Sequence, residues 1–136
     1  MIEINMDAAF KPDTKEGGIG ITIKSEPPTH LKLYIEHVWD NHQLEFMAMR
    51  QSLKYIVDQG WQNHVLVLRS DSKIVVQSID KAYVKDALYH PILTEILELM
   101  DHISLVFVKW IPEKQNRGAD QLARQALLKQ GIVMNL

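Results

Sequence analysis

Apolar and polar residues near the start of the chain alternate with the two-residue period of a half-buried β-strand. Ile2, Ile4 and Met6 alternate with polar residues, and the segments 18–24 and 31–38 are rich in Ile, Leu and Thr. The polar stretch 10–18 contains Pro and Gly and is expected to connect the first two strands. The pattern therefore predicts three strands paired as an antiparallel meander.

The hydrophobic period then changes to that of an amphipathic helix. Apolar residues recur every three or four positions over 44–59, Gly60 follows as a typical C-terminal glycine, and Asp40 or Asn41 can cap the start. The continuous apolar run 65–68 predicts a strand covered on both faces. The remaining predicted elements are helices at 72–79 and 91–100, a strand at 102–110 and a helix from 116 or 117 to 130.

The order of these elements predicts the architecture. Helices that link the third strand to the fourth, and the fourth to the fifth, imply parallel pairing in the second half of the sheet. We therefore predict an α/β fold with a five-stranded mixed sheet and helices on both faces. With 136 residues, of which 46% are hydrophobic, the chain fits a single domain over 1–136.

Composition and charge exclude several classes of function. The chain has no cysteine, which rules out disulfides, thiolate zinc sites and cysteine nucleophiles. Its net charge is −2, so a nucleic-acid partner would be held by a local patch, by few contacts or through bound cations. The apolar runs are short and no signal-like segment leads the chain, so we expect a soluble, cytoplasmic protein with no membrane partner.

Four acids fall where the pattern places the ends of elements. Asp7 and Asp71 come late in strands, whereas Glu45 and Asp120 fall in the first turns of helices. Taken alone, the strand acids could be a solvated residue and a turn former, and the helix acids could complement helix dipoles. If the two strands are parallel neighbours, however, Asp7 and Asp71 meet at one edge of the sheet, where catalytic groups gather in α/β proteins.

Carboxylates brought together repel one another unless they are protonated or bridge cations. Hard divalent ions suit a site with only oxygen ligands, so we expect Mg²⁺, with Mn²⁺ as a substitute. Two such ions about 3.5 to 4 Å apart would support phosphodiester hydrolysis, one activating water and the other stabilising the leaving oxygen.

Four motifs give the chain a resemblance to the type I ribonuclease H family: INMDAA around Asp7, NHQLEFMAMRQSL around Glu45, LRSDSKIVVQSI around Asp71, and WIPEKQNRGADQLARQAL around Asp120. The resemblance implies a ribonuclease H-like fold in which these four acids are the catalytic residues and the ligands of two metal ions. The family cuts the RNA strand of RNA/DNA hybrids and leaves 5′-phosphates. The implied function is that of a metal-dependent endonuclease.

The chain departs from the family in two loops. Asp7 is followed by Ala8, where glycine is common, and the loop 111–119 lacks the histidine that many bacterial members carry there. Loss of such an acid–base group slows turnover by about 10²- to 10⁴-fold, and Glu113 is the one carboxylate that could replace it. Two alternatives stay open: a slow or inactive module that binds nucleic acid or a protein, and a nuclease for another nucleic acid.

The candidate substrate contacts lie close to these acids. His42 is expected to contact a phosphate or to be a plain surface residue, and Ser72 is a candidate that also suits a helix cap. Basic residues are in excess from position 109 onward, and the loop part is the candidate phosphate-contacting surface, with an ordinary charged helix face as the alternative. The substrate-binding candidates are Asn41, His42, Ser72, Lys114, Asn116 and Arg117. We expect the partner to be nucleic acid, namely an RNA/DNA hybrid. We expect a monomer, with a dimer left open. The apolar tail 132–136 is expected to fold back on the sheet.

Overall fold

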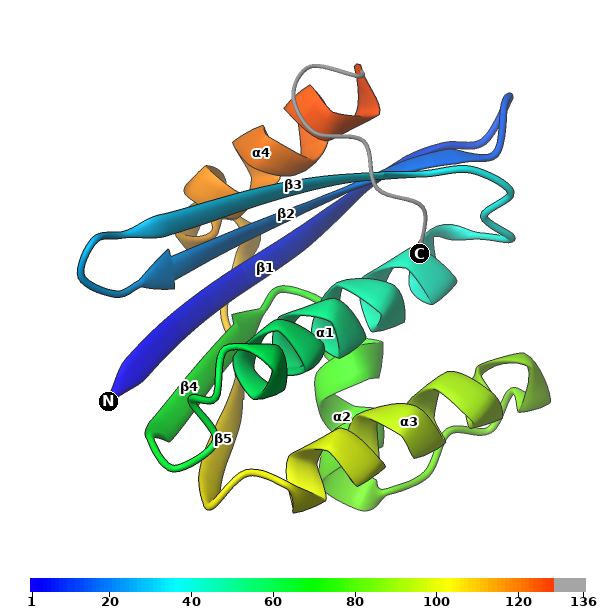
Figure 1. Cartoon of the computed structure of the whole chain (residues 1–136). Helices are drawn as coiled ribbons and strands as arrows, with labels where there is room; N and C mark the ends of the chain where they lie inside the picture. The colour runs from blue at the N-terminus through cyan, green and yellow to red at the C-terminus, as the bar shows by residue number, and fades with distance from the viewer. Residues whose placement is uncertain (129–136) are drawn as a thin grey trace.

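Three consecutive strands come first, and helices then separate the last two strands, in residues 1–128, the part of the chain that the computed structural model describes (Figure 1). The strands are β1 (Ile2–Lys11), β2 (Glu16–Lys24), β3 (Thr29–Ile35), β4 (Val65–Ser70) and β5 (Leu105–Trp110). The helices are α1 (Asn41–Asp58), α2 (Lys73–Lys81), α3 (His90–Asp101) and α4 (Arg117–Leu127), with short 3₁₀ helices η1 (Ala87–Tyr89) and η2 (Glu113–Gln115).

The five strands form one mixed sheet in the order β3-β2-β1-β4-β5. β1 pairs antiparallel with β2 and parallel with β4, β2 pairs antiparallel with β3, and β4 pairs parallel with β5. The predicted α/β class and five-stranded mixed sheet are confirmed. The crossover helices α1, α2 and α3 produce the parallel half, because a parallel pair needs a long connection.

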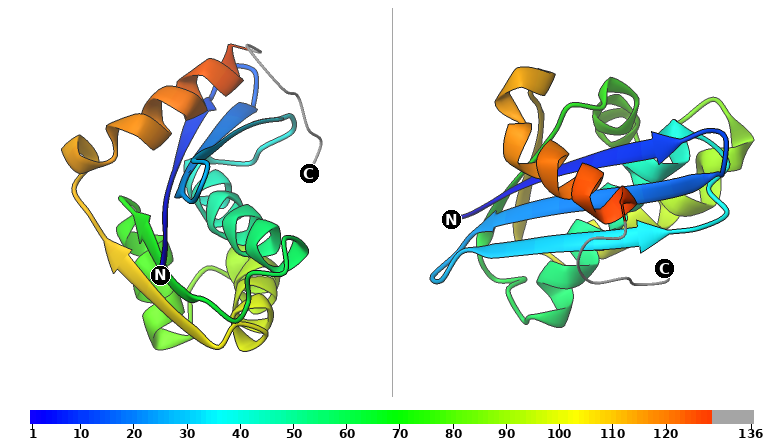
Figure 2. Two further views of the ribbon diagram at one scale, coloured as in Figure 1. Left: turned by 60° about the vertical axis from the view of Figure 1, so that its left-hand side comes forward. Right: turned by 90° about the horizontal axis from the view of Figure 1, so that it is seen from above.

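Helices cover the two faces of the sheet unequally. α1, α2 and α3 lie on one face, and α4 crosses β1, β2 and β3 on the other (Figures 1 and 2). The core between the sheet and α1 is made of fully buried side chains that include Ile4, Phe46 and Leu53. No helix within residues 1–128 is long and apolar enough to cross a bilayer.

α4 sits unusually close to the sheet. A Cβ atom added to Gly18 or Gly20 of β2 would lie nearer than 3.0 Å to the backbone of α4 at Ala123 or Ala119. The buried residues of the helix are themselves small, namely Ala119, Ala123 and Ala126. Glycine on the strand and alanine on the helix therefore set the depth at which α4 holds Asp120.

The first hairpin differs from the expectation. Residues 10–18 were predicted to be a connector, but β1 continues to Lys11 and β2 begins at Glu16, so the turn is tight. Lys15 takes a left-handed φ of 60° and its N–H bonds to the carbonyl of Lys11 at 2.9 Å. Asp7 consequently lies inside β1 and not near its end; only the parallel pairing with β4 ends beside it, at Met6 and Ser70.

Other boundaries shift by a few residues. β3 ends at Ile35, before the predicted 38, and His37 has a left-handed φ of 62°. β5 begins at Leu105 and not at 102, because the N–H groups of His102 and Ile103 still bond to carbonyls at the end of α3. Helix α4 ends at Leu127. The predicted extension to 130 and the tail 132–136 lie outside the described residues.

Candidate active site

All four predicted acids line one open cavity of about 480 Å³, together with Ala8, Asn41, Glu113 and Arg124 among others. The sheet register explains the strand pair: Met6 lies beside Ser70, so Asp7 and Asp71 are the next residues on two parallel neighbours. α1 and α4 deliver Glu45 and Asp120 from opposite faces of the sheet. The predicted convergence of these carboxylates is therefore present.

Asp7 is the most strongly perturbed acid of the cavity. Burial, followed by the negative charge of Asp71 and then that of Asp120, raises the pKa of Asp7 to about 8. The N–H of Ala8 donates to Asp7 Oδ1 at 2.8 Å and opposes this rise in the pKa. In the metal-free protein, Asp7 is thus mostly protonated at neutral pH.

Asp71 follows β4 directly and is held through Asn116 and Trp110. Burial raises the pKa of Asp71, and a hydrogen bond from Asn116 works against that rise. The indole Nε1 of Trp110, whose side chain stays 43% exposed, donates to the carbonyl of Asp71 at 3.1 Å. Lys73 places its Nζ 5.0 Å from the centroid of the Trp110 ring, so this indole is held from two sides.

Asn116 was a candidate substrate contact, and the structure places it differently. Its side chain is 1% exposed, with Nδ2 donating to the carbonyl of Met6 at 2.8 Å and Oδ1 accepting from Asn5 at 3.3 Å. An amide that is already committed to β1 and Asp71 has little capacity left for substrate. Its position makes it a residue that fixes the strand acids.

Glu45 projects from α1 and contacts a histidine. His42 Nδ1 lies 3.0 Å from Glu45 Oε1, and burial raises the pKa of Glu45 while the His42 contact opposes the rise. The prediction that Glu45 lies in the first helical turn is wrong: Asp40 caps α1 through the Gln43 N–H at 2.8 Å, so the helix starts earlier than expected. Complementing the helix dipole therefore no longer explains this acid.

Asp120 lies in the first turn of α4, as predicted. Arg124, one turn later, donates from Nε to both carboxylate oxygens of Asp120, at 3.1 and 3.0 Å. Sequence reasoning did not assign a role to Arg124. The signal was present, since an acid and a base four residues apart on one helix are neighbours.

The donor chemistry of the cavity fits hard divalent cations. The ligating atoms on offer are carboxylate oxygens, and the raised pKa of Asp7 records a repulsion that a cation would relieve. Within residues 1–128, no three His, Asp or Glu side chains are already arranged to hold a metal ion. Glu45 faces His42 and Asp120 faces Arg124 instead, so both would have to turn toward a shared ion.

The other candidate substrate contacts are divided between the cavity and its surroundings. Asn41 lines the cavity. Ser72 is buried, caps α2 by accepting from the Val75 N–H at 3.4 Å, and bonds to Glu45. Lys114 and Arg117 are exposed on η2 and at the start of α4, outside the cavity lining. Ser72 thus supports the site from within, whereas the two basic residues are free to meet a ligand.

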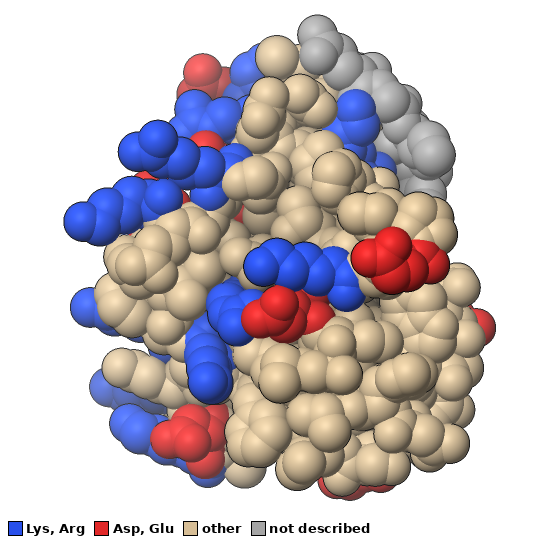
Figure 3. All heavy atoms as spheres, turned by 90° about the vertical axis from the view of Figure 1, so that its left-hand side faces the viewer, with Lys and Arg blue, Asp and Glu red and all other residues tan. Residues whose placement is uncertain are grey.

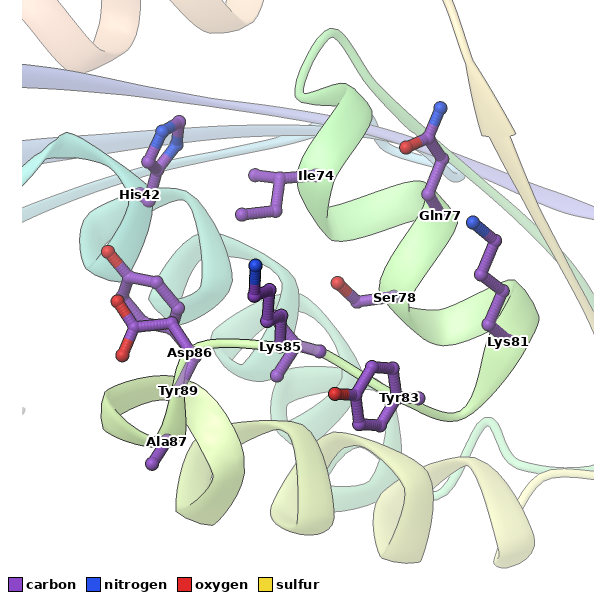
Figure 4. A pocket seen from close by; sticks show the side chains of 11 residues that line it. His42, Ile74, Gln77, Ser78, Lys81, Tyr83, Lys85, Asp86, Ala87 and Tyr89 are labelled. Atoms are coloured by element: carbon purple, nitrogen blue, oxygen red, sulfur yellow. The ribbon is translucent and has the colours of Figure 1, made fainter.

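A second, larger groove begins at His42. It has a volume of about 820 Å³ and runs between α2 and the segment that leads into η1 (Figure 4). Lys81, Lys85 and the exposed ring of Tyr83 line it. Elsewhere, Lys and Arg side chains gather along one side of the face seen in Figure 3, although the chain as a whole has a net charge of −2. Positive charge is therefore concentrated locally, as a polyanionic ligand requires.

Comparison with known proteins gives concordant matches. Residues 5–126 match the family model described as "Reverse transcriptase-like". The Enterococcus faecalis protein named "Putative hydrolase EbsB" is 41% identical over 132 residues, which cover 95% of this chain and 96% of that protein.

Solved structures extend the likeness to the fold. RNase H1 from Halobacterium salinarum NRC-1 is 21% identical with a TM-score of 0.79, covering 94% of this chain and 98% of its own. LC11-RNase H1, solved in complex with an RNA/DNA hybrid, is 23% identical with a TM-score of 0.84, covering 95% and 98%. At these identities the structural likeness establishes a shared ribonuclease H-like fold.

Proposed function

Because the chain belongs to the ribonuclease HI-like family, we propose that it is a metal-dependent endonuclease that hydrolyses the RNA strand of RNA/DNA hybrids and leaves 5′-phosphates. The convergence of Asp7, Glu45, Asp71 and Asp120 on one cavity carries this proposal. The hydrolase name of the relative and the hybrid bound to LC11-RNase H1 support it.

The four carboxylates would hold two Mg²⁺ or Mn²⁺ ions. When bound, two such ions activate a water molecule and stabilise the leaving oxygen of the scissile bond. The chain's own part is to position the ligands. Asn116 and the Ala8 N–H hold the strand acids, and His42 and Ser72 contact Glu45. Such supporting contacts typically change metal affinity or activity by about 10- to 100-fold.

The neighbouring groove offers a path for the substrate. His42 borders both the carboxylate cavity, through Glu45, and the groove that carries Lys81 and Lys85. A hybrid whose RNA strand lies at the acids can extend past His42, so that phosphates of the second strand reach these two lysines. Tyr83 adds an exposed aromatic ring to the same groove. On this proposal, Asn41 and His42 contact the hybrid between the two sites.

A cleavage assay with a labelled RNA strand tests the function. In Mg²⁺ or Mn²⁺, wild type is expected to cut the hybrid, EDTA to stop cleavage, and Asp71→Asn to lose more than about 10²-fold in rate. Asp101→Asn, a change of an exposed acid at the end of α3, is the matched control and should cut normally. If Asp71→Asn cuts as well as wild type, the site is wrong.

A substrate panel separates the alternatives. Hybrid, RNA duplex, DNA duplex and branched DNA should be compared under the same conditions, with binding measured beside cleavage. Preference for the hybrid supports the proposal, and preference for another substrate would identify a related nuclease. Binding of the hybrid without cleavage in either metal would instead identify a binding module.

A further inference from the structure

We infer that Arg124 competes directly with divalent cations for the carboxylate of Asp120. The inference rests on the proposed function, because it takes Asp120 to be a metal ligand. In addition, the guanidinium of Arg124 is a counter-ion of Asp120 that a metal ion can displace. Metal binding therefore requires Arg124 to release Asp120.

The geometry of the pair supports competition. Nε of Arg124 donates to both oxygens of Asp120, at 3.1 and 3.0 Å, so neither oxygen is left without an internal partner. The two residues are one turn apart on α4 and both line the carboxylate cavity. A cation arriving in the cavity therefore meets an Asp120 that is already engaged by the guanidinium.

The composition of the cavity explains why the guanidinium of Arg124 lies beside these acids. Its lining carries the carboxylates of Asp7, Glu45, Asp71, Asp120 and Glu113, and among the described lining residues Arg124 is the one basic side chain. In the absence of metal, this guanidinium offsets part of the repulsion. A divalent ion bound to Asp120 would neutralise the same carboxylate with a larger charge. The ion and the guanidinium therefore bind Asp120 one at a time and not together.

Arg124 can make this exchange. Its side chain is 68% exposed, so releasing Asp120 needs only a change of rotamer. Linkage then requires that each cation weakens the binding of the other by the same factor. For an exposed ion pair of this kind, the factor is about two- to fivefold.

Titration of the metal-free protein with Mn²⁺, followed by electron paramagnetic resonance of the free ion, tests the competition without substrate. Arg124→Gln is expected to bind Mn²⁺ about two- to fivefold more tightly than wild type. Arg50→Gln removes another arginine that pairs with an acid, Glu95, at 3.2 Å between α1 and α3, and neither residue lines the carboxylate cavity. It is the matched control and should leave the Mn²⁺ affinity unchanged.

A double-mutant cycle with Asp120→Asn distinguishes direct competition from a general charge effect. If Arg124 acts through Asp120, the affinity gained in Arg124→Gln disappears when Asp120→Asn is also present. A gain that persists in that background would show long-range repulsion and overturn the inference, as would an unchanged or weaker affinity of Arg124→Gln. Absence of Mn²⁺ binding in wild type would instead overturn the proposed function itself, together with this inference.

Discussion

Asp7 and Asp71 are held by strands, whereas Glu45 and Asp120 are held by helices, and the two pairs differ in what surrounds their carboxylates. The strand acids face other acids and hydrogen-bond donors of the backbone or of Asn116. The helix acids each contact a nitrogenous side chain on their own helix, His42 or Arg124.

The difference separates two ways of placing a charge. Sheet register fixes the strand acids regardless of their repulsion, and burial, followed by the charges of neighbouring acids, raises the pKa values of Asp7 and Asp71. The helix acids are placed by helix packing and have local partners that share their charge. In the metal-free protein, the strand acids therefore repel one another, whereas Glu45 and Asp120 each have a nitrogen partner, although burial raises the pKa of Glu45 as well.

Replacing Asp7 should have the largest effect and should separate activity from stability. Asp7→Asn is expected to lower hybrid cleavage more than about 10²-fold, because a metal ligand is lost. In EDTA at about pH 9, where Asp7 is charged, the same variant should melt at a higher temperature than wild type, because a buried charge and its repulsion with Asp71 and Asp120 are removed. Asp120→Asn, which also loses the Arg124 pair, should lose activity without gaining stability in EDTA. A lower Tm for Asp7→Asn than for wild type would contradict the view that repulsion among the strand acids destabilises the metal-free protein.

Pushing α4, which carries Asp120, away from the sheet should lower the stability of the fold. Gly20→Ala places a methyl group against the backbone of α4 at Ala119 and is expected to destabilise the fold by about 3 kcal/mol in urea unfolding. Gly118→Ala is the control on α4 itself, since its added Cβ would meet only Thr22 Cγ2, at an ordinary 3.6 Å. That change should be neutral or stabilise by up to about 1 kcal/mol. Equal effects of the two variants would contradict the close packing.

The pH dependence of stability tests the strand acids without any substitution. The pKa of Asp7 is raised to about 8 in the folded protein from 3.8, so folding favours its protonated form. The stability from this group is complete below about pH 4 and is lost as the pH rises toward 8. The Tm in EDTA should therefore fall from pH 5 to pH 9, and Asp7→Asn should flatten the curve. A Tm that rises with pH over this window would contradict the assignment.

The lower limit of pH 5 matters because another acid, Glu3, changes the stability of the fold with pH in the opposite direction. A hydrogen bond from Arg69 and the charge of Lys24 lower the pKa of Glu3, so its contribution to stability is lost as the pH falls. Glu3 is on the same strand as Asp7. Measurements above pH 5 keep this effect apart from the titration of the cavity.

Much of the site could be predicted from the sequence, because it depends on local pattern and on strand order. Asp71 followed by the Ser72 cap, and Asp120 in the first turn of α4, are local features. Their convergence followed from parallel pairing of two strands. The fold class was predictable for the same reason, since hydrophobic periods and the order of elements determine it.

What the sequence did not show depends on tertiary contact. The burial of Asn116 results from its bond to the carbonyl of Met6, far away along the chain, whereas asparagine ahead of a helix usually indicates a surface position. The length of β1 was underestimated because Lys and Pro in the hairpin outweighed the partly buried Phe10, which packs on the core. Asp40, one of the two predicted caps, does cap α1, so the helix begins at Asn41 and Glu45 falls beyond its first turn.

The indole of Trp110 makes the fluorescence of the protein sensitive to the active site. Its Nε1 is bonded to the carbonyl of Asp71 while its ring stays in contact with solvent, and indole emission responds to both conditions. The other two tryptophans lie elsewhere: Trp39 precedes α1, and Trp61 stacks edge-on with Tyr55 at 5.9 Å. With those two replaced by phenylalanine, fluorescence from a single natural chromophore would follow any movement of the Asp71 backbone in real time, without a label.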